Sequence, residues 1–269
     1  MSGSVEQGSE LDAVLAGIGA VAVAVSGGVD SMTLAVVAGR RLGERAEMIH
    51  ATSPAVPPEA TARVQAYAGR EGWRLSIIDA GEFADPDYLA NPANRCFFCK
   101  TNLYGAIAAR TDATIVSGTN LDDLGDWRPG LKAAAAHGVR HPYVEAGIDK
   151  ARVRALARRL RLDDLAELPA APCLSSRLAT GIPVTADRLR LVHAIERLID
   201  RELAPRTVRC RLFHDGVAIQ LDPDGLHRIT EGEAAPLRRT IEDMAGASAV
   251  RYEPYRMGSA FLRTAADGA

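Results

Sequence analysis

Hydrophobic residues in the first two thirds of the chain form short continuous runs separated by helix-spaced stretches. The run VAVAV at 21–25 is typical of a strand buried on both faces, and a helix is predicted over 29–42. The other elements expected here are strands at 48–51, 75–79 and 113–117 and helices after Pro57-Pro58, over 97–110 and over 150–160. Strands that alternate with helices predict a parallel sheet.

The last third of the chain shows shorter and more varied periodicity. Helical spacing runs from Leu189 to Ile199, and residues 208–213 alternate as a strand does. Strands at 217–221 and 249–255 and a helix at 236–245 follow, whereas residues 118–148 are expected to be irregular. We place a boundary near Gly181. The predicted fold is α/β, with a parallel sheet in domain 1–181 and a smaller α+β domain at 182–269.

A polar turn follows the first buried strand and leads directly into a helix. It reads Ser26-Gly27-Gly28-Val29-Asp30-Ser31, and its two glycines let successive N–H groups face one concavity. Such a turn at a helix N-terminus binds phosphate. A carboxylate repels a phosphate unless Mg²⁺ lies between them, so Asp30 indicates a metal-bound pyrophosphate. The alternative is an ordinary helix cap on a glycine turn.

The net charge and the N-terminal residues indicate which classes of partner and which cellular location to expect. The 269-residue chain has a formal net charge of −2 and no block of like charges, which does not favour nucleic acid. The first residues lack the basic region of a signal peptide, and their apolar stretch is interrupted, so no membrane span is expected. We expect a cytoplasmic protein.

Four cysteines lie at 96, 99, 173 and 210, and in a cytoplasmic chain they suggest metal binding or reactive sulfur rather than disulfides. Cys96 and Cys99 form a C-x-x-C pair at the start of a predicted helix. Cys210 alternates with Val208 and Leu212, which indicates a buried structural thiol. A structural zinc site and a Cys96–Cys99 redox pair are the alternatives.

Several charged residues are candidates for ligand binding. Arg209 and Arg211 share one face of their strand and suit a phosphate or carboxylate, unless that face is simply solvated. Arg177 and Arg128 are weaker anion-binding candidates. Lys100 is expected to direct its charge toward ATP phosphates or a cluster, or to be a surface lysine.

Two aspartates follow a predicted strand end, where α/β sheets place ligands. Asp122 and Asp123 are expected either to hold Mg²⁺ or to cap a helix. Of the two, Asp123 is our candidate Mg²⁺ ligand alongside Asp30.

Several segments resemble known families. The turn SGGVDS resembles the PP-loop of ATP pyrophosphatases, which split ATP between its α and β phosphates. The segments PANRCFFCK, GTNLDDLGDWRPG and APCLSSR resemble the LarE family of sulfur-insertion enzymes, which help make a nickel-pincer cofactor. The resemblance covers nearly the whole chain, from the PP-loop to the Arg209-Cys210-Arg211 strand.

This resemblance implies an activity and a set of cofactors. The enzyme would use ATP and Mg²⁺ to adenylate a pyridinium-3,5-biscarboxylic acid mononucleotide and then insert sulfur into it. Family members with three cysteines hold a [4Fe-4S] cluster, here on Cys96, Cys99 and Cys173. In another class the cysteine at the position of Cys173 is itself the sulfur donor. A homo-oligomer is also implied, while the sulfide donor is not identified.

The resulting site assignment combines the residue patterns with the resemblance. Glu196 as a substrate contact and the adenine contacts near Ala51, Gly118 and Thr119 follow from the resemblance alone. The catalytic candidates are Cys173, Asp30 and Lys100. The ATP-binding candidates are Ser26, Gly27, Gly28, Asp30, Ser31, Ala51, Gly118 and Thr119. The substrate-binding candidates are Arg209, Arg211, Arg177 and Glu196.

Two other functions use the same features. Related PP-loop enzymes thiolate tRNA, although the acidic charge balance and few aromatic residues do not favour RNA binding. An ATP-binding assembly scaffold for a nickel enzyme is the non-enzymatic alternative.

Overall fold

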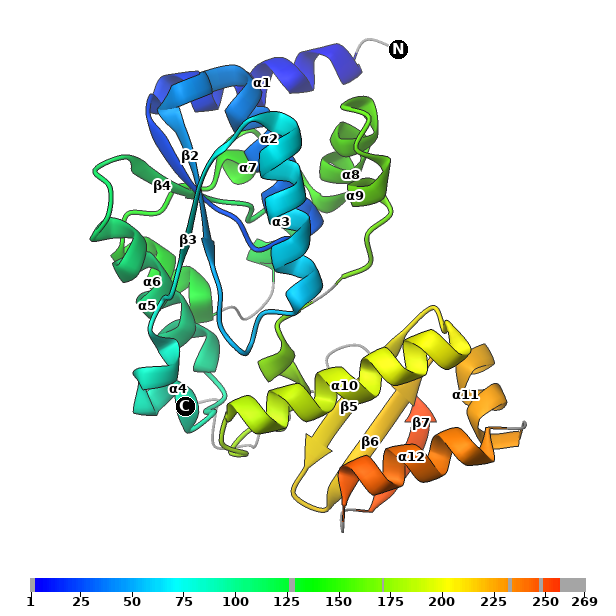
Figure 1. Cartoon of the computed structure of the whole chain (residues 1–269). Helices are drawn as coiled ribbons and strands as arrows, with labels where there is room; N and C mark the ends of the chain where they lie inside the picture. Colours follow the sequence, from blue (N-terminus) through cyan, green and yellow to red (C-terminus); the bar gives the residue numbers. More distant parts are fainter. Residues whose placement is uncertain (1–2, 126–128, 171, 232–233, 247–248, 257–269) are drawn as a thin grey trace. The chain divides into compact units, whose positions relative to one another are not determined.

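The computed structural model describes residues 3–125, 129–170, 172–231, 234–246 and 249–256 (Figure 1), and for residues 3–9 the backbone only. The chain forms two compact units, which are described separately below. The first contains residues 1–85 and 96–171, and the second contains residues 86–95 and 172–269. Within the described residues, no helix combines the length and apolar character needed to cross a membrane.

The first unit is built on a four-stranded parallel sheet in the order β3-β2-β1-β4. Its strands are β1 (Val21–Ala24), β2 (Ala46–Ala51), β3 (Arg74–Ile78) and β4 (Thr114–Ser117). Every residue of β1 is buried, because this central strand is covered by side chains on both faces. The predicted parallel α/β sheet is therefore confirmed.

Side chains on alternate faces of the sheet enter two separate hydrophobic cores. Val21, Val23 and Met48 belong to a large core shared with helices on one face. Ala22 and Ile49 point to the other face, where they join a second core. The helices of the first core are α1 (Gly3–Ile18), α2 (Val29–Leu42), α3 (Pro58–Glu71), α7 (Pro142–Glu145), α8 (Lys150–Arg159) and α9 (Asp163–Ala166). Those of the second are α5 (Arg95–Ala108) and α6 (Pro129–Ala136).

Proline and glycine residues mark the ends of several helices in this unit. Helix α3 has proline in its first turn, and it ends at Gly72, whose left-handed φ of 66° suits a C-terminal cap. Helices α6 and α7 correct the expectation that residues 118–148 are irregular. Each begins at a proline, but their lengths of 8 and 4 residues are too short to show a helical repeat.

The second unit carries a three-stranded mixed sheet in the order β5-β6-β7. Strand β5 (Val208–Phe213) runs antiparallel to β6 (Gly216–Leu221), which runs parallel to β7 (Val250–Pro254). Helices α10 (Ala186–Leu203), α11 (Pro223–Glu231) and α12 (Ala235–Ala245) share one core with this sheet. This is the small C-terminal α+β part that the sequence predicts.

Residues 86–95, which include α4 (Pro86–Leu89), belong to the second unit although the chain on either side of them belongs to the first. The Asn91 amide donates to the carbonyls of Ala179 and Ile182, both at 2.8 Å. The Val184 N–H donates to the Leu89 carbonyl at 2.8 Å. The compact units therefore divide at 171/172 and include this early segment, whereas the domain prediction divides the chain at 181/182.

Candidate functional site

The polar turn after β1 has the geometry of an anion-binding loop. The Ser31 hydroxyl lies 3.0 Å from the Ser26 N–H and 3.2 Å from the Gly28 carbonyl, which fixes the curl of the turn. Gly27 has a φ of 82°, and a Cβ there would lie 2.9 Å from Ala60. Gly28 caps α2 without a side-chain acceptor. The first N–H groups of α2 are thus left to a ligand or solvent.

The start of α2 is in direct contact with the residue that follows β4. A Cβ on Gly118 would lie 2.7 Å from the Ser31 nitrogen and 2.9 Å from the Asp30 carbonyl carbon. Glycine is therefore required at this crossing. Because β2 and β4 are the two neighbours of β1, the predicted adenine-side residues Ala51 and Gly118 lie at the same edge of the sheet as the turn 26–31.

Thr119 and the end of β4 form a small polar group. The Ser117 hydroxyl lies 3.0 Å from the Thr119 hydroxyl and 2.9 Å from Nδ1 of His141. Burial lowers the pKa of His141, partly offset by the negative charges of Glu145 and Asp123. This group provides hydroxyl and imidazole contacts beside Gly118.

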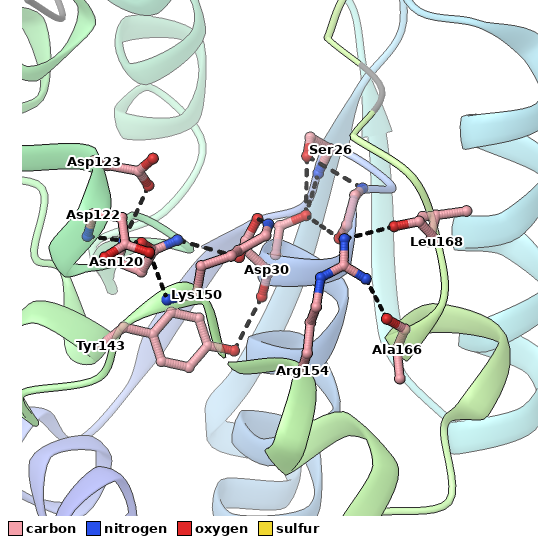
Figure 2. Close-up of polar contacts among 12 residues, drawn as sticks. Ser26, Asp30, Asn120, Asp122, Asp123, Tyr143, Lys150, Arg154, Ala166 and Leu168 are labelled. Carbon is pink, nitrogen blue, oxygen red and sulfur yellow. Dashed lines mark hydrogen bonds and ion pairs between the residues drawn. The ribbon is translucent and has the colours of Figure 1, made fainter. Parts of the chain in front are cut away.

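Asp30 lies at the centre of a polar network drawn from four segments (Figure 2). Its carboxylate forms an ion pair with Lys150 Nζ and accepts a 3.2 Å hydrogen bond from Asn120 Nδ2. The Tyr143 hydroxyl donates to the Asp30 carbonyl at 3.1 Å. Burial, with the nearby charge of Asp30, raises the pKa of Tyr143 well above its usual value, so this hydroxyl stays protonated.

Lys150 was not predicted as a site residue. It is the first residue of α8, whose N-cap Asp149 accepts from the Arg152 N–H at 2.8 Å. One turn later, Arg154 donates to the carbonyls of Ala166 and Leu168 and so holds the segment after α9 (Figure 2). The only sequence signal for Lys150 was that lysine is rare in this arginine-rich chain.

Asp122 and Asp123 both act as caps. Asp123 accepts from the Asn120 N–H at 3.0 Å and completes a capping box at η3 (Leu121–Leu124). Asp122 accepts from the Lys150 N–H at 3.2 Å, at the start of α8. The capping alternative thus describes contacts that both residues make, and Mg²⁺ binding by Asp123 stays a prediction.

Cys96 and Cys99 lie one turn apart near the start of α5, and both are partly exposed. Lys100 follows them, with Nζ 5.7 Å from the centre of the Tyr104 ring. A Cβ on Gly130 would lie 3.0 Å from Lys100 Cγ and 3.5 Å from the Cys96 carbonyl, so α6 packs closely here. This turn combines two thiols with a cation.

Cys173 belongs to the second unit, where it is exposed and precedes η4 (Leu174–Arg177). None of the four cysteines forms a disulfide. Within the described ranges, no three His, Cys, Asp or Glu side chains are grouped to hold a metal ion. The three-cysteine cluster therefore stays a prediction.

Arg177, at the end of η4, and Glu196, on α10, form a buried ion pair in the second unit. Arg177 makes a two-point contact with Glu196, at 2.9 and 3.0 Å, and donates to the Pro172 carbonyl at 2.9 Å. Glu196 also accepts from the Cys210 N–H at 2.9 Å. The guanidinium of Arg177 thereby links helix α10 and strand β5 to the segment that carries Cys173.

Arg209 and Arg211 add positive charge to this group. Arg211 is only 6% exposed, and it donates to Gln220 Oε1 at 2.7 Å and to the Ser176 carbonyl at 2.9 Å. Burial and the nearby charge of Arg177 lower the pKa of both Arg209 and Arg211. The alternative of a solvated sheet face does not describe Arg211, whereas Arg209 is partly exposed. Buried cations in excess suit an anionic ligand.

Cys210 confirms its prediction as a structural thiol. Its side chain is fully buried in the core of the second unit, and this burial raises its pKa well above the ordinary value. Arg128 and the neighbouring Trp127 lie outside the described residues.

Comparisons with known proteins were made for the whole chain. No family model matches it. An uncharacterized protein from Synechocystis is 38% identical over 213 residues, which is 78% of this chain and 79% of that protein. The pyridinium-3,5-bisthiocarboxylic acid mononucleotide synthase of Lactiplantibacillus plantarum is 30% identical over 216 residues, 78% of each chain. An uncharacterized protein from Methanocaldococcus jannaschii is 23% identical over 219 residues, 79% of this chain and 82% of the other.

Proposed function

Because the chain belongs to the family of the pyridinium-3,5-bisthiocarboxylic acid mononucleotide synthase, the LarE family, we propose that it inserts sulfur into the carboxyl groups of a pyridinium-3,5-biscarboxylic acid mononucleotide after adenylating them with ATP. The product would be the thiocarboxylate precursor of a nickel-pincer cofactor. The observation that carries the adenylation step is the loop Ser26–Ser31, with an aspartate at the start of α2.

Adenylation is needed because a carboxylate is a poor electrophile. A carboxylate oxygen of the substrate attacks the α-phosphorus of ATP, the bond to the β-phosphate bridging oxygen breaks, and pyrophosphate leaves. The N–H groups at the start of α2, with Ser26 and Ser31, would hold the phosphate oxygens as charge develops on them. A sulfur nucleophile then attacks the acyl carbon, and AMP leaves.

The residues present fit Mg²⁺ at Asp30. Asp30 lies in the first turn of α2, within the segment 26–31, and its carboxylate is the kind of oxygen ligand that Mg²⁺ prefers. When bound, Mg²⁺ would neutralise charge on the departing pyrophosphate. The contacts of Asp30 with Asn120 and Tyr143 would keep its carboxylate and its main chain oriented toward the loop.

The thiols fit an iron–sulfur cluster in ligand type. Cys96 and Cys99 are one helical turn apart, and Cys173 is exposed, so all three can supply thiolate ligands. A cluster held by three cysteines would leave one iron open to carry sulfide. Lys100, next to this pair on α5, would offset the negative charge of the thiolates.

The substrate phosphate is assigned to the arginines of β5. Arg209 is partly buried and Arg211 is buried, and with Arg177 nearby they offer positive charge and guanidinium donors that suit a phosphate. Arg177 would position the segment carrying Cys173 through its bond to the Pro172 carbonyl, and Glu196 would position β5 by accepting from the Cys210 N–H.

The test is anaerobic incubation of the full chain with ATP, Mg²⁺, sulfide and the dicarboxylate mononucleotide. We expect pyrophosphate release together with a product in which oxygen is replaced by sulfur, detected by mass spectrometry. Asp30→Ala should abolish both, with an unchanged circular dichroism spectrum. Pyrophosphate release without any thiolated product would support the assembly-scaffold alternative, and full turnover by Asp30→Ala would refute the assigned phosphate site.

A further inference from the structure

Both carboxylate oxygens of Asp30 already have partners. Oδ1 accepts from Asn120 Nδ2 at 3.2 Å, and Oδ2 forms the ion pair with Lys150 Nζ (Figure 2). A carboxylate oxygen can accept more than one contact, so a metal ion at Asp30 could be bound beside the neutral amide of Asn120, whereas it would meet the positive charge of Lys150. The surroundings of these two donors also show which of them leaves.

Asn120 is held in place on three sides. Its side chain is buried, its Oδ1 accepts from the Asp122 N–H at 3.1 Å, and its own N–H donates to Asp123 at 3.0 Å. Rotating its amide away from Asp30 would break the capping box of η3. Asn120 is therefore a fixed partner of Asp30.

The main chain of Lys150 is held by helix α8 and by Asp122, whereas its side chain is partly exposed and contacts Asp30. Its N–H donates to Asp122 at 3.2 Å, and as the first residue of α8 it is followed by a capped helix. Its side chain is 32% exposed and that of Asp30 is 26% exposed. A partly solvated ion pair on a flexible stem exchanges at small energetic cost.

We propose that Lys150 Nζ occupies the cation position at Asp30 until a metal-bound nucleotide arrives, and then moves onto the phosphate oxygens. This inference rests on the phosphate site of the proposed function. Lys150 is then a positioning residue for the nucleotide. It keeps Asp30 neutralised in the empty site, and it opposes the binding of metal without phosphate.

The reason is that one carboxylate cannot neutralise two cations. A divalent ion that enters alone meets the ammonium at the same oxygen, and like charges in a partly solvated site repel. Phosphate oxygens add the missing negative charge, so that the metal and Lys150 are bound together. Metal and nucleotide should consequently bind with positive coupling, and removing Lys150 should reduce that coupling.

The test uses the full chain with Lys150→Met, Lys150→Arg and Lys132→Met. Lys132 lies exposed on α6 and serves as the matched control for loss of one lysine charge. Binding of Mn²⁺ alone is followed by electron paramagnetic resonance, and binding of Mn²⁺ with the non-cleavable α,β-methylene analogue of ATP is followed by calorimetry. Asp30→Asn defines the metal binding that does not involve Asp30.

We expect Lys150→Met to bind Mn²⁺ alone about threefold or more tightly than the parent, because a competing ion pair is gone. The same variant should bind the metal–nucleotide complex about tenfold more weakly, since a charged contact to phosphate is lost. Lys150→Arg should retain the parent's weak binding of metal alone, and Lys132→Met should match the parent in both assays.

Unchanged or weaker binding of Mn²⁺ alone by Lys150→Met would overturn the inference, as would unchanged affinity for the metal–nucleotide complex. The metal-only measurement needs no nucleotide, so it tests the ion-pair exchange directly. If the parent protein binds no adenine nucleotide at all, the proposed function fails instead, which is a separate outcome.

Discussion

Arg211 is nearly inaccessible to solvent, and among the described residues its hydrogen bonds go to an amide oxygen and a carbonyl. Burying a guanidinium is costly, and the charges of Arg177 and Arg209 add to that cost while the charge of Glu196 offsets part of it. Arg211 is for this reason the residue whose removal best separates substrate binding from ATP binding.

We predict that Arg211→Ala weakens binding of the dicarboxylate mononucleotide by about tenfold or more, because a charged hydrogen bond to phosphate is lost. Affinity for ATP should stay unchanged. Isothermal titration with each ligand measures both. Arg211→Lys keeps the charge but loses the guanidinium's two-point geometry, so its affinity for the mononucleotide should lie between those of the parent and Arg211→Ala. Arg190→Ala, on the exposed side of α10, is the control; equal losses for both ligands would contradict the assignment.

The pairing of residues across the chain is where sequence reasoning fell short. SGGVDS identified the loop and Asp30, but nothing local indicated that Lys150, 120 residues away, forms an ion pair with that carboxylate. Glu196 was named by resemblance alone, and its contacts with Arg177 and the Cys210 N–H depend on how α10 packs on β5. The sequence shows which chemical groups are present, whereas tertiary packing determines which of them come into contact.

At the scale of elements, the chain after β4 can approach the start of α2 closely because residue 118 is a glycine. We predict that Gly118→Ala weakens nucleotide binding and lowers the free energy of unfolding by about 1–3 kcal/mol, since a Cβ would meet main-chain atoms of Asp30 and Ser31 at under 3 Å. Gly69→Ala is the matched control. Outside its own helical turn, no described heavy atom lies within 4 Å of a Cβ at this exposed position in α3, so the change should be neutral or stabilising by up to about 1 kcal/mol.

Urea unfolding with calorimetric binding of the ATP analogue measures both effects. A Gly118→Ala variant with the parent's stability and affinity would show that β4 and α2 do not need this close approach.

His50 connects three elements of the first unit. Its Nδ1 lies 2.8 Å from the Val25 carbonyl, so this nitrogen carries the proton, and its Nε2 accepts from the Thr61 hydroxyl at 2.9 Å. It thus joins β2 to α3 and to the residue that precedes the phosphate loop. Burial lowers the pKa of His50 below the ordinary value of 6.5, in spite of the opposing bond to Val25.

The sign of the pH effect follows from this lowered pKa. Between the folded and unfolded values the unfolded chain binds more protons, so the contribution of neutral His50 is complete above about pH 6.5 and is lost as the pH falls. We predict that His50→Gln lowers the free energy of unfolding by about 1–3 kcal/mol at pH 7 and by less at pH 5.

Urea unfolding at the two pH values checks this, with His227→Gln on the exposed face of α11 as control. The lowered pKa of His141 will leave some pH dependence in the variant. An identical loss at both pH values would mean that His50 does not titrate on unfolding.

Element prediction succeeded where the pattern was long. The buried runs of β1 and β4, the helices α2, α3 and α10, and the alternation in β5 all formed as expected. The short helices α4, α6, α7, α9 and α11 were missed, because four to nine residues give too few turns for periodicity to show. Helix α1 was missed as well.

At the scale of the whole molecule, the proposed cluster requires three cysteines that lie far apart in the sequence. We predict that Cys96→Ala, Cys99→Ala and Cys173→Ala each lose bound iron, because three ligands are the minimum for such a site. Cys210→Ala should keep iron and lose about 1 kcal/mol of stability or less, since one small sulfur leaves a core.

The bound iron of the four variants is measured after anaerobic preparation, and their intact mass is measured after turnover. If iron is absent from all variants and only Cys173→Ala is inactive, Cys173 is the sulfur donor. The intact mass of the parent protein should then fall by the mass of one sulfur after a single turnover.

The segment 86–95 also has a consequence for synthesis on the ribosome. Asn91 leaves the exit tunnel well before Ala179, its hydrogen-bonding partner 88 residues later. At a translation rate of about 5–20 residues per second, this segment waits on the order of 4–18 s for its partners. During that time β4 is synthesised as well, so that the strands β1 to β4 can pair. A nascent chain stalled before residue 172 should therefore protect the first sheet from protease and leave 86–95 cleavable.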